Sequence, residues 1–497
     1  MGRAQLTRVL GTEPPPEVEG VGGVTHDSRL VEPGFAFVAV PGFRRDGAEF
    51  VPEAVKRGAS LVVAQRQYAG VPVAIVPDAR AALAALACAV FGDPSAGMAV
   101  YGVTGTNGKT TTSYALYEIF SAAHAPERCG LMTTAEVVLG GPGGGGRRSV
   151  VRTTPEATEV QGTLREMLDA GVEHAVLEVS SHGIALRRVA GTRFRGALFT
   201  NLTRDHLDLH GSMEEYYRTK RKLFRWLPQE APKLTNADDP YGRRLAGEVP
   251  GAKTFGAWED ADYRVEGVRA ARAGTAFLLR YPGSVLKVES PLLGGYNVEN
   301  VAGAAALALA SGVGEEDVVR GIGGRGQVPG RFERVVSPET LGFEVIVDYA
   351  HTDVALEAAL KVARGVAKAD GERDAPGRVI CVFGAAGDRD VAKRPLMGRV
   401  ATGLAESSII TTDDAYSEDP AKIAREVAAG AGAAEYEVIL DRRAAIGRAL
   451  EVAGPGDVVL VAGKGHETVQ HLPGGDVPFH DASVVRELLG ELEEKGG

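Results

Sequence analysis

The stretch that decides the fold is Gly102–Val–Thr–Gly–Thr–Asn–Gly–Lys–Thr–Thr–Thr112. It follows an apolar segment at residues 98–103 and precedes a segment, 113–120, whose spacing is typical of a helix. A glycine turn between a strand and a helix presents backbone N–H groups to an anion, and its lysine reaches the outer phosphates of a nucleotide. We therefore predict a phosphate-binding loop in which Lys109 contacts the phosphates and the Thr110 hydroxyl binds Mg²⁺.

The composition limits the class of protein. A chain of 497 residues with 44% hydrophobic and 24% charged residues is expected to form several globular domains. Its net charge of −10 argues against a general nucleic-acid or membrane-surface binder. Cys88, Cys129 and Cys381 lack metal-site spacing and are expected to be buried thiols in a reducing compartment. Because no apolar signal core or 18-residue apolar run occurs, we expect a cytoplasmic protein without membrane contact.

The alternation of strand and helix patterns predicts an α/β fold with three domains. Residues 1–97 read as a small N-terminal α/β domain, with strands at 35–40 and 60–64, helices at 50–59 and 78–91, and a breaker at 92–95. Residues 98–330 read as a central P-loop domain with a parallel sheet, including a helix at 158–170 and strands at 174–179 and 196–200. Within it, the glycine-rich residues 140–146 predict a mobile surface loop, and a helix begins near Asn297.

Residues 331–497 read as a C-terminal, doubly wound, Rossmann-like domain. Its strands are expected at 345–348, 378–383, 408–411 and 457–462, with glycine turns at 384–387 and 463–465 after two of them. Ligands of such sheets bind beyond the carboxyl ends of the strands.

Polar residues lie at such strand ends in the central domain. Glu178 could be an ordinary carboxylate at the sheet rim, but near a phosphate loop it is expected to bind Mg²⁺. His206 and His210 have the spacing of a zinc pair, yet no third soft ligand is nearby. We therefore expect His206 to be the lone imidazole of an oxygen-rich site and His210 to be structural.

Two basic segments remain ambiguous from composition alone. Residues 216–224, which include Lys220, read as one solvated face of a helix. Arg389 follows a glycine turn and is either part of a surface charge run or a bidentate ligand of a carboxylate or phosphate.

Six motifs occur in a specific order along the chain: Thr104–Gly–Thr–Asn–Gly–Lys–Thr110, Glu178–Val–Ser–Ser–His182, Asn201–Leu–Thr–Arg–Asp–His206, Tyr296–Asn–Val–Glu–Asn300, Asp348–Tyr–Ala–His351 and Gly387–Asp–Arg–Asp390. Together they resemble the Mur ligases, ATP-dependent amide-forming enzymes of peptidoglycan synthesis. His26–Asp–Ser–Arg29, residues 42–50 and residues 463–467 resemble the members that add a diamino acid as the third peptide residue.

The resemblance implies that the three domains bind, in order, the UDP end of the substrate, ATP, and the incoming amino acid. Two substrates are implied besides ATP. One is UDP-N-acetylmuramoyl-L-alanyl-D-glutamate, which is a UDP-N-acetylmuramoyl-dipeptide, and the other is a free diamino acid. The residues implied for the first substrate are Ser28, Phe43, Arg44, Arg45, Thr153, Thr154, Ser180 and Arg188. Those implied for the nucleotide are Gly105, Thr106, Asn107, Gly108, Lys109, Thr110, Thr111, Asn297, Asn300, Arg331, Asp348 and His351. Those implied for the amino acid are Arg389, Asp413, Asp414, Tyr416, Gly463 and Glu467.

By the same resemblance, Lys109, Lys220 and His206 are catalytic, and Thr110, Glu178, His206 and Lys220 bind Mg²⁺. Lys220 falls on a lysine that carries a carbamate in the family, which overturns its reading as a solvated side chain. The implied mechanism forms an acyl phosphate from the substrate carboxylate and ATP, and the amine then displaces phosphate.

The choice of diamino acid stays open at this stage. Members that use meso-diaminopimelate carry Asp-Asn-Pro-Arg where this chain has Asp413–Asp414–Ala415–Tyr416. The missing arginine and the extra acid Asp414 favour a terminal ammonium, and hence L-lysine or a similar amino acid. Residues 463–467, however, resemble the diaminopimelate type.

Three alternatives are weighed against this prediction: another Mur ligase, a folylpolyglutamate synthetase-like ligase, and a P-loop ATPase that ligates nothing. His26–Asp–Ser–Arg29 argues against the folate enzyme, and a non-ligating ATPase leaves Arg389 without a role. We expect a monomer that binds no nucleic acid.

Overall fold

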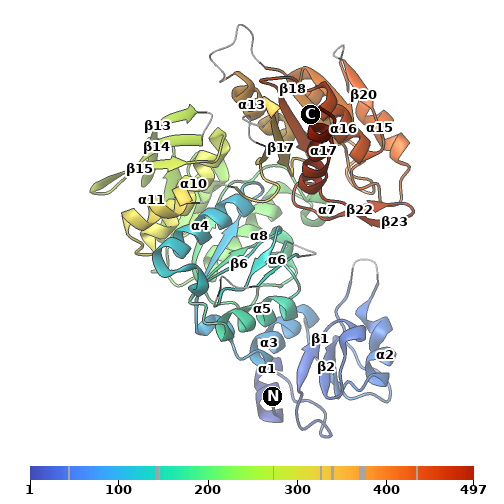
Figure 1. Ribbon diagram of the computed structural model, residues 1–497. Coiled ribbons are helices and arrows are strands. Elements are labelled where there is room, and N and C mark those ends of the chain that lie inside the picture. The colour runs from blue at the N-terminus through green and yellow to red at the C-terminus, as the bar shows by residue number, and fades with distance from the viewer. Residues whose placement is uncertain are drawn as a thin grey trace. The chain divides into compact units, whose positions relative to one another are not determined.

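The computed structural model describes residues 1–42, 45–141, 143, 146–150, 153–271, 274–324, 327–336, 341–368, 377–432 and 435–496. Its contacts divide the chain into two compact units. The first unit comprises Met1–Gly267, Leu278–Val288 and Glu299–Gly324, and the second comprises Val268–Phe277, Glu289–Val298 and Arg325–Gly497. Sheets flanked by helices form both units (Figure 1).

The N-terminal part of the first unit contains a parallel sheet with the strands in sequence order. Its strands are β1 (Gly23–Thr25), β2 (Phe35–Val38), β3 (Leu61–Ala64) and β4 (Val73–Ile75). The helices around it are α1 (Arg3–Leu10), α2 (Val51–Lys56) and α3 (Ala79–Val90). Helix α3 begins where the sequence predicts, because the Asp78 side chain accepts a hydrogen bond from the Ala81 N–H and caps the helix.

The largest sheet has the order β15-β14-β13-β12-β11-β10-β5-β9-β6-β7-β8. Its strands are β5 (Ala99–Thr104), β6 (Cys129–Met132), β7 (Val137–Val138), β8 (Arg147–Arg148), β9 (His174–Glu178), β10 (Phe194–Phe199), β11 (Lys233–Asn236), β12 (Ala252–Gly256), β13 (Tyr263–Ala271), β14 (Gly274–Tyr281) and β15 (Ser284–Ser290). Strand β5 pairs in parallel with both β9 and β10, so the phosphate loop that follows it leaves the middle of the sheet.

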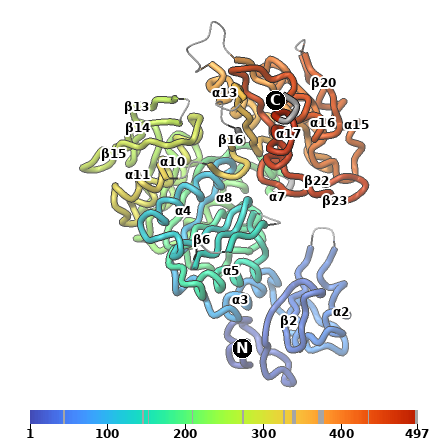
Figure 2. Tube along the Cα trace, viewed as in Figure 1, coloured from blue at the N-terminus to red at the C-terminus, as the bar shows by residue number. Residues whose placement is uncertain are grey.

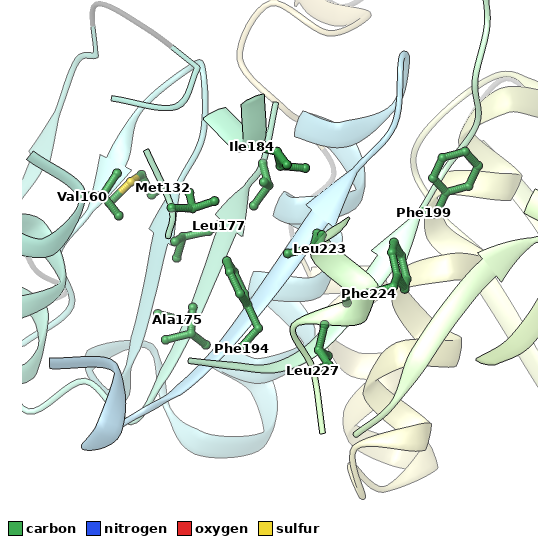
Figure 3. Close-up of a cluster of buried hydrophobic side chains, with 14 of the residues drawn as sticks. Met132, Val160, Ala175, Leu177, Ile184, Phe194, Phe199, Leu223, Phe224 and Leu227 are labelled. Atoms are coloured by element: carbon green, nitrogen blue, oxygen red, sulfur yellow. The ribbon is translucent and has the colours of Figure 1, made fainter. Parts of the chain in front are cut away.

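Helices cover this central sheet and bury its apolar faces. They are α4 (Lys109–His124), α5 (Ala157–Asp169), α6 (Ser181–Ala185), α7 (Leu207–His210), α8 (Met213–Arg225), α9 (Pro240–Glu248), α10 (Gly295–Ala310) and α11 (Glu315–Gly324). Figure 3 shows part of the core on one face, where Phe194 of β10, Leu177 of β9 and Leu223 of α8 are buried. Burying each such side chain contributes about 1.5–3 kcal/mol, so this core holds the loops at the strand ends in place.

The second unit contains a doubly wound sheet with the order β16-β17-β21-β18-β19-β20. Its strands are β16 (Glu333–Val336), β17 (Glu344–Asp348), β18 (Val379–Phe383), β19 (Ser407–Ile410), β20 (Tyr436–Val438) and β21 (Val458–Ala462). All neighbours pair in parallel except β16, which is antiparallel to β17. The helices are α13 (Asp353–Lys368), α14 (Lys393–Leu404), α15 (Pro420–Ala428), α16 (Arg442–Val452) and α17 (Asp481–Gly496).

The predicted α/β fold class is confirmed. The predicted strands and helices occur within a few residues of the expected limits, and Figure 2 traces the chain through them from the N-terminus to the C-terminus. The sequence prediction missed the antiparallel strands β7, β8 and β16, and also the hairpin of β22 (Val469–Leu472) and β23 (Gly475–Pro478). Of the predicted loop at 140–146, residues 142, 144 and 145 lie outside the described part of the chain. Among the described residues, no helix is both long and apolar enough to cross a bilayer.

Candidate active site

The phosphate loop has the predicted conformation. It connects β5 to α4, and Lys109 is the first residue of the helix. Gly108 has a φ of 80°, and a Cβ atom there would lie 2.1 Å from Oδ1 of Asn300. Only glycine fits this position, because the conformation is left-handed and the side chain of α10 approaches closely. The N–H groups at the start of α4 are therefore arranged around a potential anion site.

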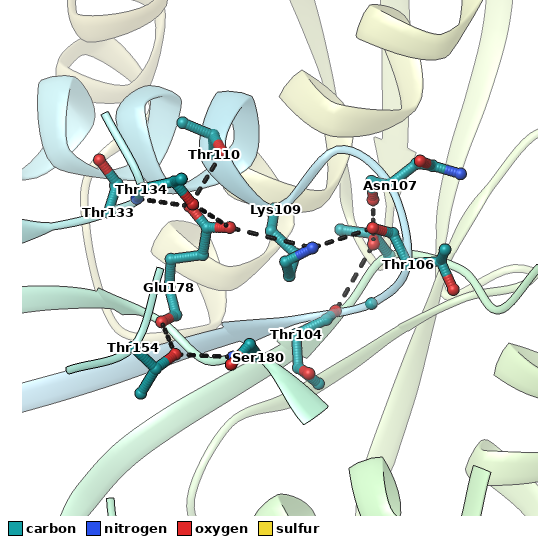
Figure 4. A network of polar contacts seen from close by, with 12 residues as sticks. Thr104, Thr106, Asn107, Lys109, Thr110, Thr133, Thr134, Thr154, Glu178 and Ser180 are labelled. Atoms are coloured by element: carbon teal, nitrogen blue, oxygen red, sulfur yellow. Dashed lines mark hydrogen bonds and ion pairs between the residues drawn. The ribbon is translucent and has the colours of Figure 1, made fainter. Parts of the chain in front are cut away.

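Lys109, Thr110 and Glu178 form one polar network at the end of β9 (Figure 4). The Thr110 hydroxyl donates to Glu178 Oε2 at 2.9 Å, and Lys109 Nζ lies 3.9 Å from Glu178 Oε1. Lys109 Nζ also donates to the Thr106 carbonyl at 2.9 Å. Thr134, which the sequence prediction did not include, donates to Glu178 from both its N–H and its hydroxyl. The network offers hard oxygen ligands beside an ammonium, a combination suited to Mg²⁺ and phosphate.

Lys220 is buried, contrary to its reading from composition alone. Helix α8 is amphipathic, and Lys220 lies on its buried side with only 1% of its surface exposed. Its Nζ donates to the Gly105 carbonyl of the phosphate loop at 2.7 Å and lies 4.8 Å from the centre of the Tyr216 ring. Burial, together with the nearby charge of Lys109, lowers the pKa of Lys220 well below its usual value. The buried environment therefore favours the neutral form of this amine at the loop.

His206 has the left-handed backbone conformation, with φ of 50°, and lies at the start of α7. Its ring packs edge-on against the ring of His182 at 4.8 Å, and its Nε2 lies 3.4 Å from Asp205 Oδ2. His210, predicted to be structural, stacks on Tyr216 at 4.8 Å. In the described part of the chain, no three His, Cys, Asp or Glu side chains gather closely enough to hold a metal by themselves.

Thr154, Ser180 and Arg188 form a second group beside the same strand end. Thr154 Oγ1 donates to the Glu178 carbonyl at 3.1 Å and accepts from the Ser180 N–H at 3.0 Å. Arg188 donates to the Thr154 carbonyl at 3.1 Å and pairs with Glu156 at 2.6 Å. These contacts bring Thr154, Ser180 and Arg188 together beside Glu178. Thr153, which was predicted with them, directly precedes Thr154.

The predicted UDP residues are only partly described. Ser28 is buried and donates to Glu53 Oε2 at 2.8 Å. Arg45 pairs with Glu49 at 3.0 Å and lies over the Phe50 ring at 4.3 Å. Phe43 and Arg44 lie outside the described residues.

The remaining nucleotide positions are found in both units. In the first unit, Asn300 Oδ1 accepts from the Thr112 hydroxyl at 3.3 Å and thus contacts the helix after the phosphate loop. Asn297, in the second unit, donates to the Leu293 carbonyl at 2.7 Å.

Arg331, Asp348 and His351 also belong to the second unit. Asp348 accepts hydrogen bonds from the N–H groups of Phe332 and Ala350, and burial raises its pKa. Arg331 lies over the Tyr349 ring at 4.5 Å. Burial and the charge of Lys393 lower the pKa of His351 to about 4, so its ring is neutral near pH 7.

The predicted amino-acid residues gather in the second unit, beyond the ends of β18, β19 and β21. The Arg389 guanidinium lies 5.5 Å from the centre of the Tyr416 ring, and Tyr416 stacks on His471 at 5.1 Å. A Cβ atom on Gly463 would lie 2.9 Å from Asp413 Oδ2, so these two residues are adjacent. The exposed position of Arg389 beside Tyr416 leaves its guanidinium accessible to a ligand.

Lys464 was not among the predicted site residues, although its side chain joins two of them. Its Nζ donates to Asp414 Oδ1 at 2.8 Å and to Glu467 Oε2 at 2.9 Å. Its sequence signals were its place between two glycines at the end of a predicted strand and its position within residues 463–467, which resemble the members that add a diamino acid. Since Asp414 is already paired with a cation, its charge no longer argues for a substrate ammonium.

Comparisons with known proteins identify the family of the chain. Three family models match in sequence order: "Mur ligase family, catalytic domain" at residues 20–91, "Mur ligase middle domain" at 103–308, and "Mur ligase, glutamate ligase domain" at 330–465. The chain is 42% identical over 480 residues to the UDP-N-acetylmuramoyl-L-alanyl-D-glutamate–2,6-diaminopimelate ligase of Geobacillus thermodenitrificans, covering 94% of each chain. It is 40% identical over 501 residues to the ligase of the same name from Gloeobacter violaceus, covering 98% of this chain and 97% of that one.

A solved structure gives the same result. The structure of a UDP-N-acetylmuramoyl-L-alanyl-D-glutamate–2,6-diaminopimelate ligase aligns with a TM-score of 0.67 and 30% identity, covering 98% of this chain and 99% of that one. The family resemblance predicted from the motifs is therefore confirmed. The chain belongs to the Mur ligase family and is an ATP-dependent acid–amino-acid ligase.

Proposed function

We propose that the protein adds 2,6-diaminopimelate to UDP-N-acetylmuramoyl-L-alanyl-D-glutamate in peptidoglycan synthesis. Relatives with that name share 40–42% identity over nearly the whole chain, and this similarity supports the choice of substrates. The structural observation that carries the proposal is the group of Lys109, Glu178 and Lys220 around one phosphate loop. Such a group can bring a carboxylate and a nucleotide phosphate together despite their like charges.

The assignment of the sites follows the predicted residues. The first substrate is bound by Ser28 and Arg45 near its UDP end and by Thr154, Ser180 and Arg188 near its peptide. The amino acid is bound beyond the strand ends of the second unit, near Arg389, Gly463 and Glu467. We retain the domain limits 1–97, 98–330 and 331–497, a monomeric state and a cytoplasmic location as parts of this proposal.

The first chemical step joins the terminal carboxylate of the peptide to the γ-phosphorus of ATP. A carboxylate oxygen forms the new bond to phosphorus, while the bond from phosphorus to the departing ADP oxygen breaks. Lys109 places its ammonium at the loop, where it neutralises charge on the transferring group. In the second step the amine attacks the acyl carbon, a proton is lost, and phosphate leaves.

Mg²⁺ and ATP fit the residues at the loop. Mur ligases use both, and a structure similar to this chain is described as an ADP complex. Mg²⁺, when bound, supplies positive charge to the phosphates. The Glu178 carboxylate and the Thr110 hydroxyl would hold it, and His206 is a third candidate from the neighbouring loop.

Lys220 is proposed to carry a carbamate. Its neutral amine attacks CO₂, an N–C bond forms, and one proton is released, which leaves an anionic oxygen ligand. Burial favours this reaction because a protonated amine is not a nucleophile.

The sequence-based preference for L-lysine is replaced by 2,6-diaminopimelate. One of its two grounds was Asp414 acting as an unpaired negative charge, but Lys464 pairs with it at 2.8 Å. The missing motif arginine remains a real difference, because Tyr416 stands in its place. Arg389, which lies beside the Tyr416 ring, is the cation that can donate to the far carboxylate of diaminopimelate instead.

A direct test is the release of ADP by the purified protein. We expect release only when ATP, the UDP-sugar dipeptide and diaminopimelate are all present, with diaminopimelate used better than L-lysine or L-ornithine. A protein that hydrolyses ATP equally well without the other two substrates would instead be a non-ligating ATPase. Use of a different peptide substrate would identify another Mur-type or folate-type ligase.

A further inference from the structure

Lys464 lies at the centre of a buried ion network in the proposed amino-acid site. Its side chain has no exposed surface, and its Nζ contacts Asp414 Oδ1 at 2.8 Å and Glu467 Oε2 at 2.9 Å. The two carboxylates come from different segments, since Asp414 follows β19 and Glu467 follows β21. One ammonium therefore bridges two strand ends.

Each carboxylate is fixed by another contact. Asp414 Oδ1 also accepts from the His471 N–H at 2.9 Å, and Glu467 Oε1 accepts from the Tyr349 hydroxyl at 3.3 Å. Burial by itself would lower the pKa of Lys464, but the charges of Asp413, Glu467 and Asp414 outweigh it and raise that pKa. Lys464 is therefore an ammonium, and it neutralises part of the negative charge of this region.

We propose that Lys464 is a specificity-determining residue, whose ammonium occupies the cation position between Asp414 and Glu467 that the side-chain ammonium of a substrate would otherwise take. The inference rests on the proposed function, because it requires that the incoming amino acid binds beside these residues. Its geometrical basis is the pair of contacts below 3 Å on a fully buried lysine.

The chemistry of the two candidate amino acids explains the effect. The side chain of L-lysine ends in a single ammonium, whereas the far end of diaminopimelate carries an ammonium and a carboxylate. The Lys464 ammonium weakens the attraction of this acidic region for the positive end of lysine and reduces its repulsion of the extra carboxylate of diaminopimelate. Without that cation, Asp414 and Glu467 would attract lysine and repel the carboxylate.

The test compares kcat/KM for diaminopimelate and for L-lysine in charge variants. In Lys464→Met, we expect the ratio of diaminopimelate to lysine to fall by about tenfold or more, the change produced by about 1.4 kcal/mol. In Asp414→Asn, which keeps the shape of the side chain but removes one negative charge, we expect the ratio to rise. In the double variant Lys464→Met/Asp414→Asn, the ratio of diaminopimelate to lysine should be closer to the wild-type ratio than it is in Lys464→Met.

Two controls separate charge from packing. Lys464→Arg retains the positive charge and should preserve the direction of the wild-type preference. Lys422→Met removes an exposed lysine that pairs with Glu418 in the same unit, and should leave the ratio unchanged. If Lys464→Met does not fold, Asp414→Asn and Glu467→Gln test the same prediction with isosteric changes.

The inference is overturned if the ratio stays constant in Lys464→Met and Asp414→Asn while the absolute rates fall together, because Lys464 would then only support the fold. The sign of the shift can be measured whichever amino acid the wild type prefers. Failure of the proposed function has a different signature, since the wild type would then release no ADP in response to either amino acid.

Discussion

Replacing Lys109 by alanine is expected to lower the rate of ADP release by about 10²–10³-fold, the usual effect of losing one electrostatic contact to a transition state. Lys109 begins helix α4, and its Nζ lies 3.9 Å from Glu178 at the phosphate loop. When the peptide carboxylate approaches ATP, two negatively charged groups come together. The Lys109 ammonium is the positive charge that the phosphate loop itself provides to offset their repulsion. Its removal should therefore affect the chemical step more than the fold.

Steady-state kinetics and thermal unfolding of the same preparation check this prediction. Lys222→Ala is the matched control, since Lys222 is an exposed lysine on α8. The variant Lys109→Ala should unfold within a few degrees of the wild type. A near-normal rate of product formation would show that the loop lysine does not serve phosphoryl transfer.

Replacing Lys220 by alanine is expected to abolish most activity, and a short carboxylic acid such as acetate or propionate should restore part of it. The alanine leaves space beside Tyr216 and the Gly105 carbonyl, where the acid can supply the oxygen ligand that the proposed carbamate provides. The lowered pKa of Lys220 supports this role, because burial and Lys109 favour the neutral amine that reacts with CO₂.

The measurement is the dependence of the rate on the concentration of the added acid. Lys109→Ala serves as the control, because a carboxylate cannot replace an ammonium and should not restore activity there. Mass spectrometry of the native protein should also detect the mass of one CO₂ at Lys220. Absence of rescue, together with an unmodified lysine, would exclude the carbamate.

The sequence was sufficient for features that depend on local patterns. Strand β5, the glycine turn and helix α4 are contiguous, so their spacing alone predicts the phosphate loop. The same holds for the strand ends that carry Glu178 and Asp413, because buried parallel strands are recognised in the sequence as apolar runs.

Residues 43 and 44, which were assigned to the UDP site, lie outside the described structure.

Features that depend on distant contacts could not be read from composition. Lys220 lies in a strongly charged helix, and only its packing against the Gly105 carbonyl, 115 positions away, makes it a buried amine. Thr134 reaches Glu178 across 44 positions, and no motif marks it.

The choice of amino acid shows why the pairing of charges matters. Asp414 alone suggests a site for an ammonium, but Lys464 lies 50 positions further along and already satisfies it. A count of charges in one motif cannot reveal such a pair, because the two oppositely charged residues are far apart in the sequence and meet only in the folded chain. The proposal of diaminopimelate in place of lysine rests on this contact and on the relatives.

The central claim is that a peptide carboxylate attacks the last phosphate of ATP at the loop of Lys109 and Lys220. It can be tested by labelling the terminal carboxylate of the UDP-sugar dipeptide with ¹⁸O and analysing the phosphate released during ligation. The account predicts that one labelled oxygen is transferred to the phosphate for each amide formed. Phosphate without the label, in a reaction that still forms the amide, would contradict it.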